Sequence, residues 1–137
     1  MNMEFLKDGS EGCPLIRIFG TDRDEFSSLH RVIMLLASGE VKACRADEIN
    51  GLPIIGDCVL TLTASAQDEG VSREGHTSNF IWKLTPKKWS VVAGFIEPFL
   101  SDPRLGSFQW LAGKEARHGL DVGAIAILLS HSNNGQW

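Results

Sequence analysis

The sequence predicts an α+β fold, a single mostly antiparallel sheet of about six strands with two helices on one face. Three observations predict it: short segments rich in β-branched and aromatic residues, two stretches with apolar residues at helical spacing, and an order of elements that occurs twice. The expected order is β-α-β-β-β-α-β-β. A chain of 137 residues fits a single domain, 1–137, because two domains of half that length would each bury a small core.

The first half of the chain is expected to hold a strand, a helix and two further strands. These are a strand at 14–19, a helix between Asp22 and Gly39, and strands at 40–46 and 57–63; a further short strand at 4–7 is expected to pair with the strand at 14–19. The helix prediction rests on a capping Thr21 or Asp22, acidic residues in the first turn, an apolar stripe that recurs every three or four positions, and a terminal glycine. Residues 65–78 are expected to form a polar loop.

The second half repeats this order. Its elements are a strand at 80–84, a helix that begins at Thr85–Pro86, and strands at 108–111 and 124–129. Threonine followed by proline is typical of a helix start, because the threonine can cap the free amides and the proline already has a helical φ. Pro98 is expected to bend or end this helix, since proline removes an amide and clashes with the preceding turn.

The repeated order predicts an internal duplication, with half-repeats 14–65 and 79–131. The apolar stripes of the two helices superimpose without gaps, so that Phe26 corresponds to Trp89. The closing strands align after a small insertion, Val59 with Ile125. The alternative is that any two amphipathic helices align this well.

Composition and the cysteines restrict the class of protein. Thirteen Lys and Arg against seventeen Asp and Glu give a net charge of −4, which argues against non-specific binding to nucleic acid. We find neither an apolar run long enough to span a bilayer nor a signal-peptide pattern. Cys13, Cys44 and Cys58 are odd in number and lack Cys-x-x-Cys spacing, so we expect reduced thiols in a cytoplasmic protein. The alternative is that Cys44 and Cys58 lie on neighbouring strands and are redox-active.

The last strand is apolar on both sides, which is typical of a strand covered on both faces. Two helices on one face leave the other face of the sheet uncovered. We therefore expect an additional cover, which is a second copy of the chain, another protein, or a loop of the chain itself. The expected interface residues are Ile125, Ile127, Leu129, Val59 and Trp137.

No common catalytic, nucleotide-binding or metal-binding motif occurs in the sequence, and no cofactor is expected. The start of the second helix combines free amides with two lysines, which together suit a small anion. His76 and His131 are the histidines that best fit a general base. The candidate ligand-binding residues are Thr85, Lys87, Lys88, His76 and His131.

These observations predict a small cytoplasmic protein-interaction or regulatory domain without a catalytic set, homodimeric through the outer face of its sheet. The alternative is an enzyme or small-ligand binder with an anion site at the start of the second helix. Neither a membrane nor a nucleic acid is expected as a partner.

Overall fold

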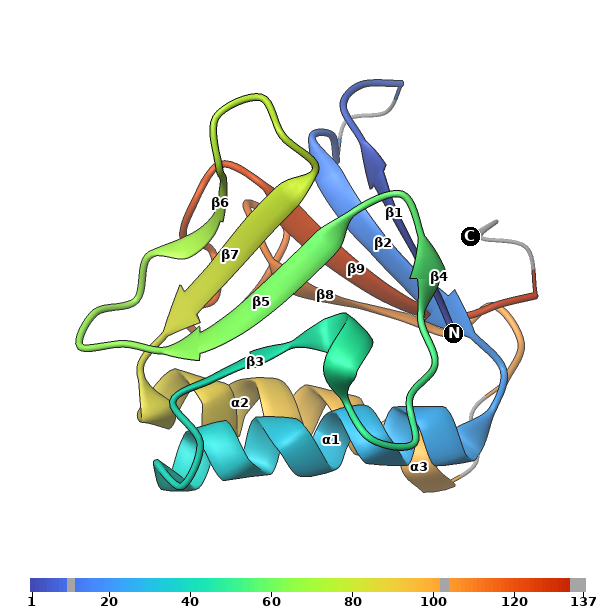
Figure 1. Cartoon of the computed structure of the whole chain (residues 1–137). Coiled ribbons are helices and arrows are strands. Elements are labelled where there is room, and N and C mark those ends of the chain that lie inside the picture. The colour runs from blue at the N-terminus through green and yellow to red at the C-terminus, as the bar shows by residue number, and fades with distance from the viewer. Residues whose placement is uncertain (10–11, 102–103, 134–137) are drawn as a thin grey trace.

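The computed structural model describes residues 1–9, 12–101 and 104–133, and in these ranges it has three α-helices and two mixed sheets (Figure 1). Sheet A has the strand order β4-β1-β2-β9-β8, and sheet B has the order β3-β5-β7-β6. The α+β class is confirmed, but the prediction of one antiparallel sheet of six strands is wrong.

The elements of sheet A are β1 (Asn2–Leu6), β2 (Leu15–Gly20), β4 (Ile55–Gly56), β8 (Phe108–Ala112) and β9 (Ala126–His131). Those of sheet B are β3 (Ala43–Arg45), β5 (Val59–Ala64), β6 (Gly70–Arg73) and β7 (Asn79–Leu84). The helices are α1 (Arg23–Ser38), α2 (Pro86–Ile96) and α3 (Pro98–Ser101), with a 3₁₀ turn at Ala46–Glu48.

Both long helices begin and end where local chemistry predicts. The Asp22 side chain accepts a hydrogen bond from the Asp24 amide at 2.9 Å and caps α1, and Gly39 ends it in the left-handed conformation at φ 81°. Thr85 caps α2, and the helix stops at Ile96, just before Pro98. The predicted helix boundaries are therefore confirmed.

Each sheet is built from both halves of the chain. In sheet A, β2 lies parallel to β9, and in sheet B, β5 lies parallel to β7. An antiparallel strand then flanks each member of these pairs: β1 and β8 in sheet A, β6 and β3 in sheet B. The order β1-β2-α1-β3-β5 thus has the same pairings as β6-β7-α2-β8-β9.

The equivalence extends to the register of the strands. Leu15 pairs with Ala126 in sheet A, and at the matching place in sheet B Asn79 pairs with Val59. Val59 therefore corresponds to Ala126, one position later than the predicted match with Ile125. Because side chains alternate between the two faces of a strand, a slip of one residue exchanges those faces.

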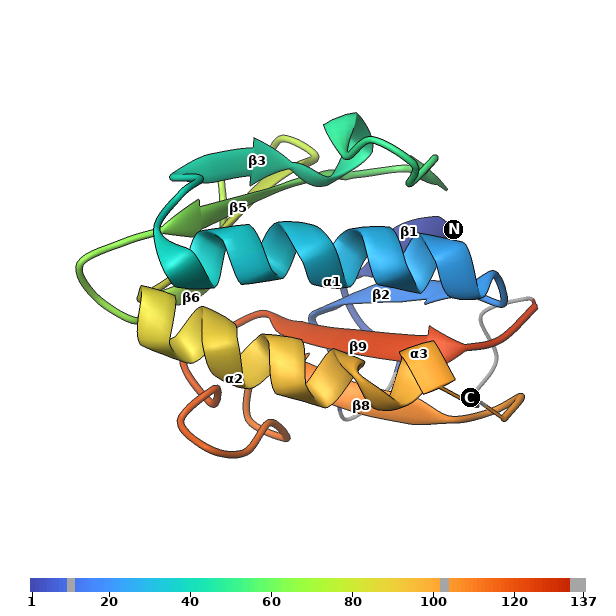
Figure 2. The ribbon, with the colours of Figure 1, turned by 90° about the horizontal axis from the view of Figure 1, so that it is seen from below.

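One apolar core lies between the sheets and the helices. Figures 1 and 2 show the strands of the two sheets running in crossing directions, with α1 and α2 side by side along the same side of both. Leu60, Leu62 and Trp82 reach the core from sheet B, and Ile16 and Ile127 reach it from sheet A. The face of each sheet that points away from this core is called its outer face below.

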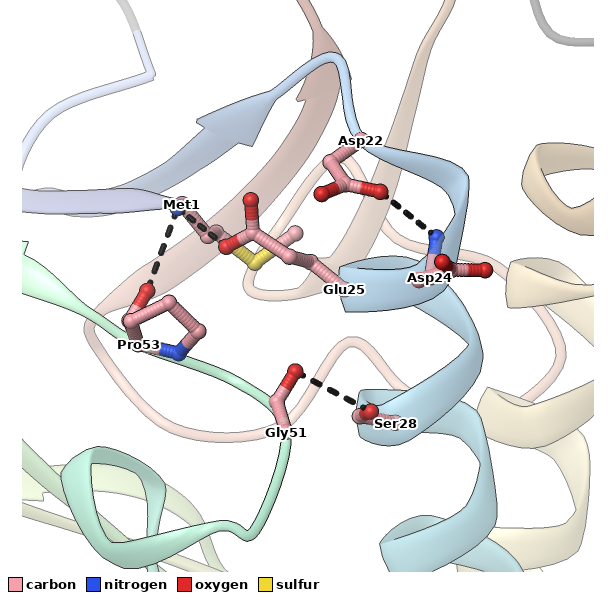
Figure 3. A network of polar contacts seen from close by, with 7 residues as sticks. All are labelled: Met1, Asp22, Asp24, Glu25, Ser28, Gly51 and Pro53. Atoms are coloured by element: carbon pink, nitrogen blue, oxygen red, sulfur yellow. Dashed lines mark hydrogen bonds and ion pairs between the residues drawn. The ribbon is translucent and has the colours of Figure 1, made fainter.

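An ion pair joins the start of β1 to α1 (Figure 3). The Met1 amino group is partly buried, pairs with the Glu25 carboxylate and donates a hydrogen bond to the Pro53 carbonyl oxygen at 3.1 Å. One turn further along α1, the Ser28 hydroxyl donates to the Gly51 carbonyl oxygen at 3.2 Å. These contacts hold the connection between β3 and β4 against α1 and β1.

Candidate functional site

The outer face of sheet B is mostly polar. By strand register it presents Ala43, Arg45, Val59, Thr61, Thr63, Ser72, Asn79, Ile81 and Lys83. Most of these residues carry hydroxyl, amide or charged groups, as expected for a sheet with one face in water. Arg45 also pairs with Asp47, at 2.7 Å between Nη2 and Oδ2. This face has the composition of an ordinary hydrated surface.

The outer face of sheet A is largely apolar. By the same register it presents Leu6, Leu15, Phe19, Ile55, Phe108, Trp110, Ala126 and Leu128, together with Asn2, Glu4, Arg17 and Ser130. At three equivalent places leucine or tryptophan in sheet A replaces a polar residue of sheet B, whereas at a fourth place Arg17 of sheet A replaces Ile81 of sheet B. The equivalent pairs are Leu15 and Asn79, Leu128 and Thr61, and Trp110 and Arg45.

The middle of this outer face is already buried within the single chain, where Leu15, Phe19 and Leu128 are 8% exposed or less. A Cβ placed on Gly12 would lie 2.7 Å from the Trp110 ring and 3.2 Å from the Leu15 side chain, so the indole ring packs beside both. Arg17 pairs with Glu4, and its guanidinium carbon lies 5.5 Å from the centre of the Phe19 ring. Burial lowers the pKa of Arg17, which shows that this cation is partly removed from water.

The two edges of the face remain open. Among the described residues four large apolar side chains are exposed, and two of them lie here: Ile55 on β4 at 73% and Phe108 on β8 at 56%. Ser130, next to Phe108 in the register, is fully buried, and its hydroxyl has no hydrogen-bond partner. The exposed apolar side chains of this face are therefore confined to its two opposite edges.

Two pockets lie at opposite corners of this face. The first, of about 270 Å³, is lined by Asn2, Met3, Glu4, Phe19, Ile55, Gly56 and Asp57. The second, of about 250 Å³, is lined by Gly12, Cys13, Gly113, Lys114, Gly123, Ala124 and Ala126. Two carboxylates lie at the first corner and the Lys114 ammonium group at the second. The Asp57 carboxylate also accepts a hydrogen bond from the Phe5 amide at 3.1 Å.

The predicted interface residues do not form this surface. Ile125, Ile127 and Leu129 belong to the core and are 8% exposed or less, because the other side of β9 faces outward. Val59 lies on the outer face of sheet B. Trp137 falls outside the described residues. The expectation of an outer apolar face holds for sheet A, but the strand side assigned to it was wrong.

The predicted anion site is not assembled. The Asp68 carboxylate already accepts hydrogen bonds from the Thr85 amide at 2.8 Å and from the Thr85 hydroxyl at 2.9 Å. A second anion there would be repelled by this carboxylate. The Lys88 ammonium group donates to the His118 carbonyl oxygen at 3.2 Å, and Lys87 is exposed.

The two candidate histidines lie apart from the start of α2. His76 is exposed in the connection between β6 and β7, at the opposite end of β7 from Thr85. Six strand residues separate those ends, a length of about 20 Å. His131 ends β9 in the other sheet, where its ring lies 6.2 Å from that of Phe26. The three parts of the expected site therefore do not face a common cleft.

Neither an activated cysteine nor a metal site is found among the residues described below. Cys13, Cys44 and Cys58 form no disulfide, and Cys44 pairs in register with Leu62, four positions beyond Cys58. Burial raises the pKa of the Cys44 thiol, and it raises the pKa of Cys58 to about 12, so neither is an activated thiolate. Within the described ranges no cluster of three potential metal ligands occurs, and no helix has the length and apolar character needed to cross a membrane.

Comparisons with models of protein families, with curated proteins and with solved structures found no match for this chain. The outer face of sheet A is thus the surface on which a functional proposal can rest. An apolar outer face was expected from the sequence, but its residues were not, because Leu15, Phe19 and Trp110 have the composition of core strand residues. The sequence of β2 does indicate such a face, because both faces of this strand carry apolar side chains and Arg17 is its one charged residue.

Proposed function

We propose that this protein is a protein-interaction domain that forms a homodimer by packing the outer faces of two copies of sheet A. The observation that carries the proposal is the contrast between the equivalent outer faces: polar in sheet B, apolar in sheet A. The equivalent residues also differ in burial: Leu15 and Leu128 are 0% and 1% exposed, whereas Asn79 is exposed and Thr61 is half-buried. The three cysteines, which form no disulfide, fit the reducing, cytoplasmic compartment that the sequence predicts.

The size of the face sets the expected strength of the dimer. Five strands about 4.8 Å apart and at most six residues long cover roughly 20 by 24 Å. That is roughly 480 Å², whereas a stable specific interface buries about 800 Å² on each partner. The dimer therefore needs the loops at the corners of the sheet as well as the strands, and we expect micromolar affinity.

The test is the oligomeric state of matched variants. We expect the wild-type protein to sediment as a dimer at high micromolar concentration, and Phe108→Asp to sediment as a monomer because it places a charge at the edge of the apolar face. Met34→Asp makes the same kind of change at an exposed apolar side chain on α1, away from sheet A, and should leave the dimer intact. A wild-type protein that stays monomeric at that concentration contradicts the proposal.

A further inference from the structure

We infer that the dimer has one defined register, in which Lys114 of each copy enters the acidic corner pocket of the other. This inference rests on the proposed dimer and specifies how its faces are aligned. The acidic corner is lined by Glu4 and Asp57, and the basic corner by Lys114. The occupant of each pocket is thus a side chain of a second copy of this chain.

The strand pairings fix where the two corners lie. Asn2, which lines the acidic pocket, pairs with Phe19 at the end of β2 and with Ile55 on the edge strand β4. Ala126, which lines the basic pocket, pairs with Leu15 at the start of β2, on the side of the sheet toward β8. The corners are therefore diagonally opposed: they differ in position along the strands and across them.

A diagonal arrangement matters because a homodimer interface has twofold symmetry. When two copies stack face to face, the twofold axis lies in the plane between the sheets. An axis perpendicular to the diagonal that joins the pockets brings each acidic corner over the partner's basic corner. An axis along the strands, or one across them, does not bring these corners together. Two equivalent charge pairs thus select one of several stacking directions.

The chemistry of the acidic pocket fits a lysine side chain. Phe19 and Ile55 supply apolar walls for the methylene stem of the partner's lysine. The carboxylates of Glu4 and Asp57 line the same pocket and would face its ammonium group. Glu4 also pairs with Arg17. Lys114 is exposed, and no ion pair of its own occurs among the described contacts. Its ammonium group is available to a partner.

The same axis explains the position of Phe108. Phe108 pairs with Ser130 on β9, and Ser130 pairs with Phe19 on β2. Along the strands, Phe108 is therefore level with the acidic corner. Across the strands, it lies at the opposite edge of the sheet. That third corner lies on the twofold axis. Phe108 of one copy therefore meets Phe108 of the other, and a contact between two aromatic rings covers the apolar side chain that is most open on β8.

Charge reversal tests the register. Lys114→Glu faces the acidic pocket with a carboxylate, and Asp57→Lys faces Lys114 with a second ammonium group, so each variant alone should dimerise roughly tenfold or more weakly than wild type. Mixing the two variants creates a heterodimer in which both corners pair opposite charges. We expect this mixture to recover wild-type affinity in sedimentation velocity, whereas Lys83→Glu, the same reversal on sheet B, should change nothing.

Asp57→Lys also removes the hydrogen bond that the Asp57 carboxylate accepts from the Phe5 amide. Ile55→Lys is therefore a second variant, because it brings a lysine to the same pocket and keeps that hydrogen bond. A wild-type monomer contradicts the proposed function itself. A wild-type dimer whose affinity is unchanged in Lys114→Glu, or two weakened variants that do not recover on mixing, leaves the dimer standing and overturns only this register.

Discussion

At the scale of single residues, the Cys58 thiol shows how burial controls chemistry in this protein. It lies directly before β5, is 8% exposed, and has Asp57 beside it. Loss of water and the neighbouring carboxylate both disfavour the thiolate, so the pKa is raised from 9.0 to about 12. The residue behaves as a small apolar core side chain rather than as a nucleophile.

This raised pKa predicts a loss of stability in alkali. The unfolded chain releases the Cys58 proton above pH 9, whereas the folded chain keeps it until about pH 12. The contribution is therefore fully present below pH 9, and in the window between those values the free energy of unfolding falls by about 1.4 kcal/mol per pH unit. Urea unfolding across this range should show that slope reduced in Cys58→Ala. Cys13→Ala controls for the loss of a thiol, and equal slopes in all three proteins would contradict the prediction.

At the scale of elements, α2 contains a glycine that the fold does not need. Gly94 is exposed in the interior of the helix, and a Cβ there would meet no atom within 4 Å. Glycine weakens helices because its backbone loses more freedom on folding than that of alanine. Thr85 caps the start of α2, and Trp89, Val92 and Ile96 form its buried face, so these residues rather than Gly94 stabilise the helix.

We expect Gly94→Ala to raise the free energy of unfolding by about 0.5–1 kcal/mol. The matched comparison is Gly39→Ala, which places a Cβ at φ 81° at the end of α1 and should lower the same quantity by about 1 kcal/mol. Chemical denaturation of both variants measures the two effects. Destabilisation by Gly94→Ala would show that the open space beside this glycine is filled in solution.

At the scale of the whole molecule, the Met1–Glu25 ion pair connects sheet A, α1 and the segment that leads to β4 (Figure 3). The Met1 amino group is partly buried, and the side chain of Glu25 is 15% exposed. A buried cation that loses its carboxylate keeps the cost of its desolvation without the attraction that offset it.

Glu25→Gln should therefore lower the free energy of unfolding by about 1.5–3 kcal/mol, the usual range for a hydrogen bond to a charged group. Asp24→Asn, in the same turn but exposed, is the control and should cost less than 1 kcal/mol through the helix dipole alone. Thermal or urea unfolding distinguishes the two. Similar losses in both variants would mean that the dipole, and not the ion pair, accounts for the effect.

Patterns within a few neighbouring residues predicted the helices and most strands, but they did not predict which distant strands pair. The caps at Asp22 and Thr85 and the break at Pro98 are contained in a few neighbouring residues. The strand β6 was missed because Gly70–Arg73 is short and half polar, and it forms only against β7. The two-sheet arrangement depends on β2 meeting β9 from the other end of the chain.

The candidate site shows the same division between local and distant information. An apolar outer face was predicted from the alternation in β9, but alternation alone does not say which side of a strand meets the helices. The register does: Ile127 faces the core and Leu128 faces outward. The anion site failed for a related reason, because Asp68, which occupies the cap at Thr85, reaches it from the segment before β6.

The parallel pairs β2–β9 and β5–β7 each join the two halves of the chain, so neither half can complete a sheet alone. Each sheet joins a hairpin from one half of the chain to a hairpin from the other, so a half on its own has two unfinished sheets and a helix without its neighbour. A polypeptide of half the length would reach the same architecture by interleaving with an identical molecule. In a single chain that contains both halves the two outer faces can carry different side chains, and here that of sheet B is mostly polar and that of sheet A is largely apolar.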